Sequence, residues 1–102
     1  MVEEPVLVVI EVVSVQDPEG LKTYIQRASQ LIGSFGGELV ARGGHPIGDE
    51  PGFAPLVIQR WPSQAALHAW LGSDAYQPLN AIRLASATIR AAIVPSIAGR
   101  HP

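Results

Sequence analysis

GGELVARGG, residues 36–44, is the stretch around which the rest of the chain is arranged. Gly36 and Gly37 suit the end of a helix, because glycine adopts the left-handed cap conformation without a steric penalty from Cβ. Residues 38–42 are typical of a short strand. Gly43 and Gly44 indicate a sharp exit from that strand, or a place where backbone approaches another group closely. We therefore expect the guanidinium of Arg42 at the junction of strand and loop.

Upstream of this stretch, the sequence predicts a strand followed by an amphipathic helix. Residues 6–13, VLVVIEVV, are nearly all β-branched and do not alternate with polar residues, which predicts a strand buried on both faces. Asp17 is a suitable N-cap, and Pro18 suits the first helical position. Apolar residues then recur at three- and four-residue steps from Leu21 to Phe35, so the spacing predicts one wide apolar face of a helix that ends at Gly36.

Downstream, turn-forming residues separate two further strands. Residues 43–53, GGHPIGDEPGF, predict an exposed loop. Residues 54–61, APLVIQRW, predict the third strand, with Pro55 near its start. Residues 88–94, TIRAAIV, predict the fourth strand, and Pro95 should stop it.

Between the third and fourth strands, the pattern predicts two helical segments. Ser63 should cap a short helix that Gly72 breaks. Ser73 and Asp74 should start a further segment, which continues through Ala85. Pro78 would lie inside that segment, and we expect it to loosen the first turn.

The order β-α-β-β-α-β predicts an α+β fold, a ferredoxin-like plait with an antiparallel four-stranded sheet. We expect one domain over residues 1–95 and a flexible C-terminal tail over residues 96–102. Two helices can cover only one face of such a four-stranded sheet. Because the first strand lacks a polar face, the uncovered face needs a partner, and the simplest partner is the same face of a second copy. The sequence thus predicts a homodimer through the sheet faces, although it does not tell which face.

The composition narrows the classes of partner. Of the 102 residues, 47% are hydrophobic and only 16% are charged, which leaves little polar surface and is consistent with a buried subunit interface. The chain has nine acidic and seven basic residues, and the basic residues do not cluster in the sequence, so we expect no nucleic-acid partner. The N-terminal MVEEP lacks a positively charged region, and no apolar run reaches membrane-spanning length, so we expect a cytoplasmic protein without a membrane partner.

Several pieces of the sequence resemble, in order and spacing, the bacterial domain-of-unknown-function family 1330. They are Asp17-Pro18-Glu19-Gly20, Phe35-Gly36-Gly37, Leu39-Val40-Ala41-Arg42-Gly43-Gly44, Pro62-Ser63, Tyr76-Gln77 and Ile82-Arg83. One departure is Asn80, which stands where that family usually has a lysine. The resemblance implies the dimeric α+β barrel superfamily, in which two plaits close their sheets into a barrel. Related families there include cofactor-free monooxygenases, haem-degrading enzymes and lactone isomerases, which share architecture rather than chemistry.

Three charged residues are candidates for chemistry. Arg42 and Arg83 could bind a carboxylate or enolate through their planar guanidinium groups, or each could be a structural arginine. Glu11 interrupts an apolar strand and could act as a general base. The alternative for Glu11 is a salt bridge to Arg60, Arg90 or Arg42. If Arg42 and Arg83 share one pocket, then either a glutamate, Glu11 or Glu38, or a bound organic acid must neutralise them.

Two aromatic residues complete the candidate ligand-binding set of Tyr24, Arg42, Tyr76 and Arg83. The phenols of Tyr24 and Tyr76 could point into a pocket between helices and sheet, or could belong to the core with satisfied hydroxyl groups. His45, His68 and His101 lie in a loop, a helix and the tail, and there is no cysteine, so we expect no metal site and no cofactor.

Three classes of function remain open. The protein could be a cofactor-free enzyme that acts on a small organic acid, a non-catalytic binder of the same kind of molecule, or a dimeric scaffold with no ligand. Turnover would separate the first two classes. A fully packed core without a cavity would favour the third.

Overall fold

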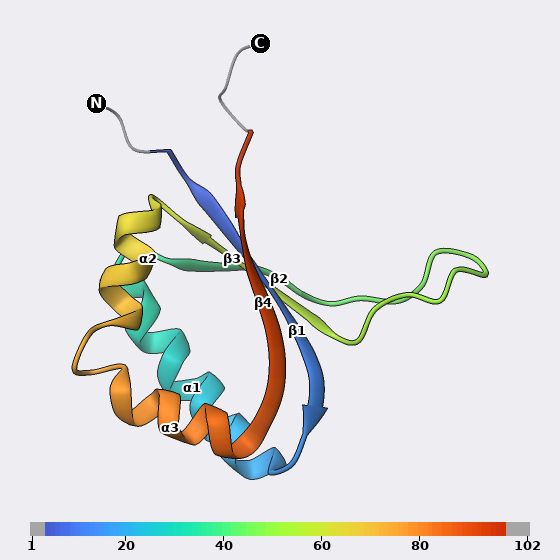
Figure 1. Cartoon of the computed structure of the whole chain (residues 1–102), viewed down its shortest axis with the longest axis horizontal. Helices are drawn as coiled ribbons and strands as arrows, with labels where there is room; N and C mark the ends of the chain where they lie inside the picture. Colours follow the sequence, from blue (N-terminus) through green and yellow to red (C-terminus); the bar gives the residue numbers. More distant parts are fainter. Residues whose placement is uncertain (1–3, 98–102) are drawn as a thin grey trace.

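The computed structural model describes residues 4–97 and has two layers, a sheet and a group of helices (Figure 1). The elements follow the order β1 (Val6–Val15), α1 (Pro18–Ser34), β2 (Glu38–Gly43), β3 (Leu56–Trp61), α2 (Gln64–Leu71), α3 (Gln77–Ser86) and β4 (Ala87–Pro95). The four strands form one antiparallel sheet in the order β2-β3-β1-β4. The α+β ferredoxin-like plait predicted from the sequence is confirmed.

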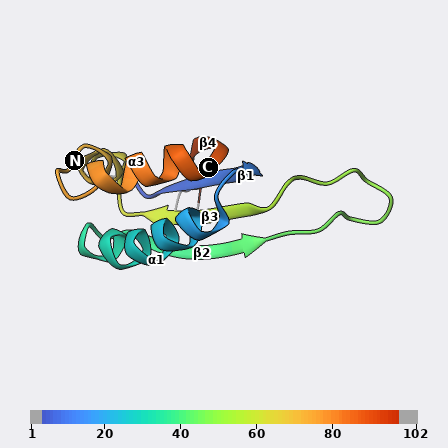
Figure 2. The same ribbon diagram turned by 90° about the horizontal axis from the view of Figure 1, so that it is seen from below.

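The helices lie together on one side of the sheet, and α1 and α3 run side by side (Figure 2). The loop of residues 44–55, between β2 and β3, projects away from both layers (Figure 1). The predicted exposed loop is thus confirmed in position. Of the predicted tail, residues 98–102 lie outside the described residues.

Local signals set the limits of α1. The carboxylate of Asp17 accepts a hydrogen bond from the Gly20 N–H at 3.1 Å, and Pro18 is the first helical residue, as the sequence predicts. At the other end, Gly36 has a φ of 90°, and the Gly37 N–H donates to the Ile32 carbonyl at 2.9 Å. Only glycine adopts such a φ without strain, so the helix has to end here.

The last helix begins later than the sequence predicts. Residues 73–76 form a turn, in which the Ser73 hydroxyl accepts a hydrogen bond from the Tyr76 N–H at 3.2 Å. Helix α3 starts only at Gln77, so Pro78 lies in its first turn. The expectation that Pro78 loosens the helix is therefore wrong, because the first N–H groups of a helix have no intrahelical partner to lose.

The core lies between the helices and the helix-facing side of the sheet. Its centre is Trp61, whose side chain is completely buried and stacks on Trp70 with ring centroids 5.3 Å apart. Val6 and Val8 of β1 belong to this core. The neighbouring Leu7 and Val9 point to the opposite side of the sheet, because successive side chains of a strand alternate. Both are half-buried in the single chain.

Candidate functional site

Two cavities lie between the helices and the sheet. The first has a volume of about 220 Å³ and is lined by Trp70, Tyr76 and Leu67 among others; we name it the aromatic compartment. The second has a volume of about 110 Å³ and is lined by Arg42 together with side chains of α1; we name it the arginine compartment. Five residues line both, namely Ile10, Tyr24, Gln59, Arg83 and Ile89. The two cavities therefore adjoin along a common wall.

A β-bulge places Arg42 on the cavity side of the sheet. Leu39 pairs with Gln59, and Ala41 pairs with Ile58, so Val40 has no partner in the register. Without this extra residue, strict alternation would put Leu39 and Arg42 on opposite faces. With it, Arg42 pairs with Val57 and lines the arginine compartment beside Leu39.

Arg83 reaches the same compartment from α3. Its Nε and Nη2 atoms donate to the Asn80 Oδ1 atom, at 3.3 and 2.9 Å, one helical turn earlier. This forked contact holds the guanidinium in one orientation at the common wall of the two cavities. Arg42 and Arg83, which the sequence reasoning considered as members of one pocket, both line this cavity.

No carboxylate in residues 4–97 pairs with either of these arginines. Glu38 forms its ion pair with Arg60 at 2.8 Å. Glu11 is paired with Arg90, so both glutamates that could have neutralised the cavity are engaged elsewhere.

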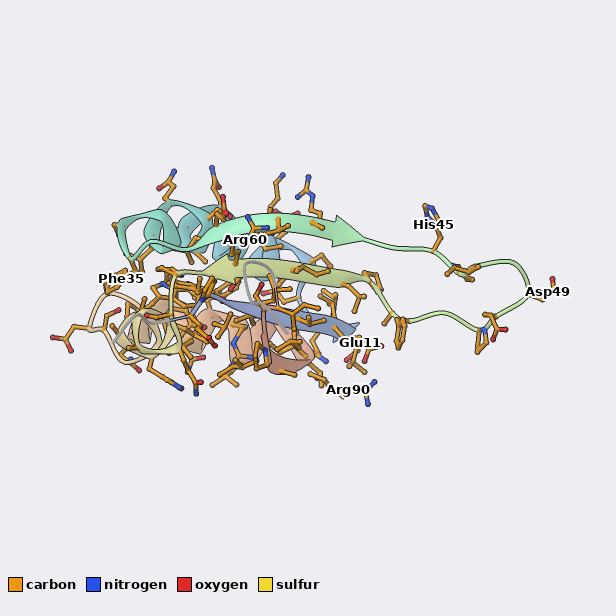
Figure 3. All side chains as sticks on the ribbon, turned by 90° about the horizontal axis from the view of Figure 1, so that it is seen from above. Glu11, Phe35, His45, Asp49, Arg60 and Arg90 are labelled. Atoms are coloured by element: carbon orange, nitrogen blue, oxygen red, sulfur yellow. The ribbon has the colours of Figure 1, made fainter. Side chains whose placement is uncertain are left out.

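Glu11 lies on the face of β1 that points away from the helices, and it lines neither compartment. Figure 3 shows it beside Arg90 of β4, whose Nε atom donates to the Glu11 Oε1 atom at 2.8 Å. The Ala54 N–H also donates to this carboxylate, at 3.2 Å. The hydrogen bond from Arg90 holds the pKa of Glu11 below its ordinary value. The salt bridge considered as the alternative role for Glu11 is therefore present, with Arg90 as the partner.

Tyr24 and Tyr76 are brought together at the aromatic compartment. Their hydroxyl oxygens are 3.1 Å apart and form a hydrogen bond, and the rings meet edge to face. Burial, and after it the hydrogen bond with Tyr76, raises the pKa of Tyr24. The phenol of Tyr24 is therefore held neutral at pH 7, and the hydrogen-bonded pair offers hydroxyl groups to the cavity.

Three cavity residues were missed by the sequence reasoning: Gln59, Trp70 and Asn80. Gln59 is nine-tenths buried, and its Oε1 atom accepts from the Trp61 Nε1 atom at 3.0 Å. One signal could have identified it, since Gln59 lies between Val57 and Trp61 on a face of the strand that is otherwise apolar. Nothing local distinguished Trp70 from an ordinary helix residue, and Asn80 was noted only as a departure from the family pattern.

Neither of the two histidines in residues 4–97 lines either compartment. His45 lies on the projecting loop, as does Asp49, far from the cavities (Figure 3). His68 is on the exposed side of α2, 3.3 Å from Gln64, and His101 lies outside the described residues. Within residues 4–97, no three His, Asp or Glu side chains are placed to hold a metal ion. No helix in this part of the chain is long and apolar enough to cross a membrane.

The chain resembles known proteins over nearly its whole length. Residues 5–97 match the family described as a domain of unknown function, DUF1330. No curated protein matches the chain.

Solved structures show the same fold. A protein of unknown function from Rhodopseudomonas palustris, RPA0582, is 21% identical, with a TM-score of 0.75 over 92% of this chain and 83% of that one. SnoaB from Streptomyces nogalater, described as a cofactor-independent oxygenase, is 16% identical, with a TM-score of 0.68 over 91% of this chain and 93% of that one. At these identities the likeness establishes the fold and leaves the chemistry open.

Proposed function

The chain belongs to the DUF1330 family, and from its cavities we propose that it binds a small organic acid with an apolar body. The observation that carries this proposal is the pair of arginines in one cavity, neither with a carboxylate partner among the described residues. The scaffold class of function would need a fully packed core. Two adjoining cavities favour a ligand instead.

The electrostatics of Arg42 and Arg83 favour an anion. Two positive charges at one cavity repel each other. Arg42 is exposed and Arg83 is half-buried, so water screens part of this repulsion. A carboxylate bound between them would remove the repulsion and accept paired hydrogen bonds from a planar guanidinium. The remaining walls are mostly aliphatic and aromatic, which suits an apolar body on the same ligand.

The polar groups of the cavities favour binding over general-base catalysis. Among the residues that the structure describes, no carboxylate or histidine lines either compartment. The raised pKa of Tyr24 keeps its phenol neutral at pH 7, so this hydroxyl is a poor general base. We accordingly assign Arg42, Arg83, Tyr24 and Tyr76 to ligand binding, and we leave Glu11 out of the site.

A second candidate is cofactor-free turnover of the bound acid. It is favoured by the hydrogen-bonded phenols at the cavity wall, which could orient a substrate oxygen. The neighbour described as a cofactor-independent oxygenase is a reason to test this reaction first. Oxygen uptake with a bound acid separates the two candidates, because a binder consumes no oxygen and returns the acid unchanged.

A thermal melt with matched ligands tests the proposal. We use 4-isopropylbenzoate and, as a neutral control of the same shape, 4-isopropylbenzamide. We expect only the acid to raise the unfolding midpoint, because only the acid carries the charge. Arg42→Ala and Arg83→Ala should each remove most of this rise. Arg27→Ala, a change of an exposed arginine outside both compartments, should keep it. Equal shifts with acid and amide, or a rise that survives both cavity substitutions, would refute the proposal.

The homodimer expected from the sequence remains part of the proposed function. The face of the sheet without helices carries Leu7, Val9, Leu56 and Ile58, all half-buried in the single chain. Covering these aliphatic side chains with the same face of a second copy would remove them from water. The cytoplasmic location also remains a prediction.

A further inference from the structure

Asn80 holds the guanidinium of Arg83 along one of its edges. The Asn80 Oδ1 atom accepts from the Arg83 Nε and Nη2 atoms, at 3.3 and 2.9 Å. Both residues belong to α3 and lie one helical turn apart, so the contact forms within a single element. The guanidinium makes no other hydrogen bond and no ion pair within residues 4–97. Its second edge, formed by Nη1 and the outer hydrogen of Nη2, therefore has no partner among these residues.

The charged end of Arg83 lies near the common wall of the two compartments. Asn80, whose amide contacts the guanidinium, lines the aromatic compartment, and Arg83 lines both. Tyr24 lines both as well. Burial is the main cause that raises the pKa of Tyr24, and the positive charge of Arg83 acts in the opposite direction. The guanidinium, and not only the aliphatic part of the side chain, is thus close enough to this phenol to act on it.

The partner of Arg83 is neutral, which distinguishes Arg83 from two arginines on the strands. Arg60 and Arg90 each form an ion pair with a glutamate. A carboxylate partner orients an arginine and cancels its charge, whereas an amide carbonyl orients it and leaves the charge in place. Arg83 is therefore fixed in orientation and carries a positive charge that no described residue cancels.

Arg42, the other arginine of the candidate site, is less constrained. It is exposed, and its side chain makes no hydrogen bond or ion pair within the part of the chain that the structure describes. Ordering a flexible side chain on binding lowers affinity, and a side chain that is already ordered in the free protein avoids this cost. Of the two arginines, Arg83 is therefore the better pre-organised for a ligand.

We propose that Asn80 is a positioning residue of the acid site, which holds Arg83 with its free edge available to the carboxylate of the ligand and with its positive charge uncancelled. This inference rests on the proposed function, because the ligand is the same organic acid. The free edge of the guanidinium presents two parallel N–H groups, which match the two oxygens of one carboxylate. Asn80 thus acts on the ligand through Arg83.

A double-mutant cycle on acid affinity tests this role. In titration calorimetry with 4-isopropylbenzoate, we expect Asn80→Ala to bind about five- to tenfold more weakly than the wild type, because Arg83 must then be immobilised on binding. In an Arg83→Ala background, Asn80→Ala should cause no further loss. Gln26→Ala, which removes an exposed amide of α1 outside both compartments, should bind as the wild type does. An equal loss in both backgrounds, or no loss in either, would overturn the role of Asn80.

Asn80→Asp separates orientation from charge. The introduced carboxylate has nearly the shape of the amide and can accept the same two N–H groups, but it forms an ion pair with Arg83. We therefore expect Asn80→Asp to bind 4-isopropylbenzoate more weakly than Asn80→Ala does, although Arg83 stays fixed. If Asn80→Asp binds the acid as tightly as the wild type, the neutral partner has no importance and the inference is wrong.

A further measurement on the wild-type protein does not depend on a folded variant. In ¹⁵N NMR spectra, the Nε–H group of Arg83 should exchange with water more slowly than that of the exposed Arg27, because it is bonded to Asn80. Equally fast exchange of the two groups would show that Asn80 does not hold Arg83, and would leave the binding of acids standing. If the wild type does not bind 4-isopropylbenzoate, the proposed function fails, and the present inference fails with it.

Discussion

Gly37→Ala should destabilise the protein for a purely steric reason. Gly37 is buried and does not have a positive φ, so alanine costs nothing in backbone conformation. A Cβ atom at this position, however, would lie 2.7 Å from Cζ2 of Trp61 and 2.8 Å from two further atoms of the same ring. The ring cannot retreat easily, because it is fully buried, stacked on Trp70 and hydrogen-bonded to Gln59.

The size of the effect follows from this contact. Overpacking a well-packed core costs about 1–3 kcal/mol, and contact distances this short place Gly37→Ala near the upper limit. For a domain of this size, roughly 3 kcal/mol corresponds to a midpoint about 10–20 °C lower. Urea unfolding at one fixed protein concentration should give a lower midpoint with an unchanged slope. Far-UV circular dichroism and tryptophan fluorescence should report the same transition.

Two further variants test the steric explanation. Gly33→Ala, near the end of α1, adds a Cβ that meets nothing within 4 Å, so it should leave stability unchanged or raise it slightly. Trp61→Phe removes the ring atoms that the new Cβ would meet, so the cost of Gly37→Ala should largely disappear in that background. A neutral Gly37→Ala, or an equal cost in both backgrounds, would contradict the reasoning.

Three other predictions follow from the same structure. Gly43 has a φ of 101° with open space around it, so Gly43→Ala should cost about 1 kcal/mol or more in urea unfolding from backbone strain alone; a neutral result would refute this. Val9→Lys, on the sheet face without helices, should give a folded monomer in sedimentation velocity where the wild type gives a dimer. Val8→Lys, in the core, should instead unfold the protein. If Val9→Lys remains a folded dimer, the proposed interface is wrong. The folded-state pKa of Glu11 is lowered, so its pairing with Arg90 stabilises the protein above the unfolded-state pKa of about 4.5, and the stabilisation is lost as the pH falls through the lower folded-state pKa. The stability difference between the wild type and Glu11→Gln should therefore shrink between pH 6 and pH 3, and a difference that does not depend on pH would refute this.

The sequence by itself determined the order of the elements and most of their limits. The signals involved act over a few residues: Asp17 caps a helix, and Gly36 ends it. The spacing of the apolar residues determined whether each segment was predicted as a helix or as a strand. The start of α3 was mistaken because the Ser73 hydroxyl bonds within a turn, while a helix cap was expected there. These short-range signals were sufficient to predict the ferredoxin-like plait and to place Arg42 at the end of a strand.

Only the tertiary structure decided which way these residues face. Whether Val8 or Val9 belongs to the core depends on which side of the sheet the helices cover. The partner of Glu11 depends on strand register, which brings Arg90 opposite it from 79 residues away.

The candidate site likewise depends on how the strands of the sheet pair with one another. The bulge at Val40 places Arg42 on the cavity side of the sheet, and the fold brings Arg83 of α3 to the same cavity. Register and bulges arise from contacts between strands far apart in the chain, and the periodicity of a single segment does not contain them. The sequence could therefore name the two arginines and suggest a shared pocket, but only the strand pairing and helix packing place both at one cavity.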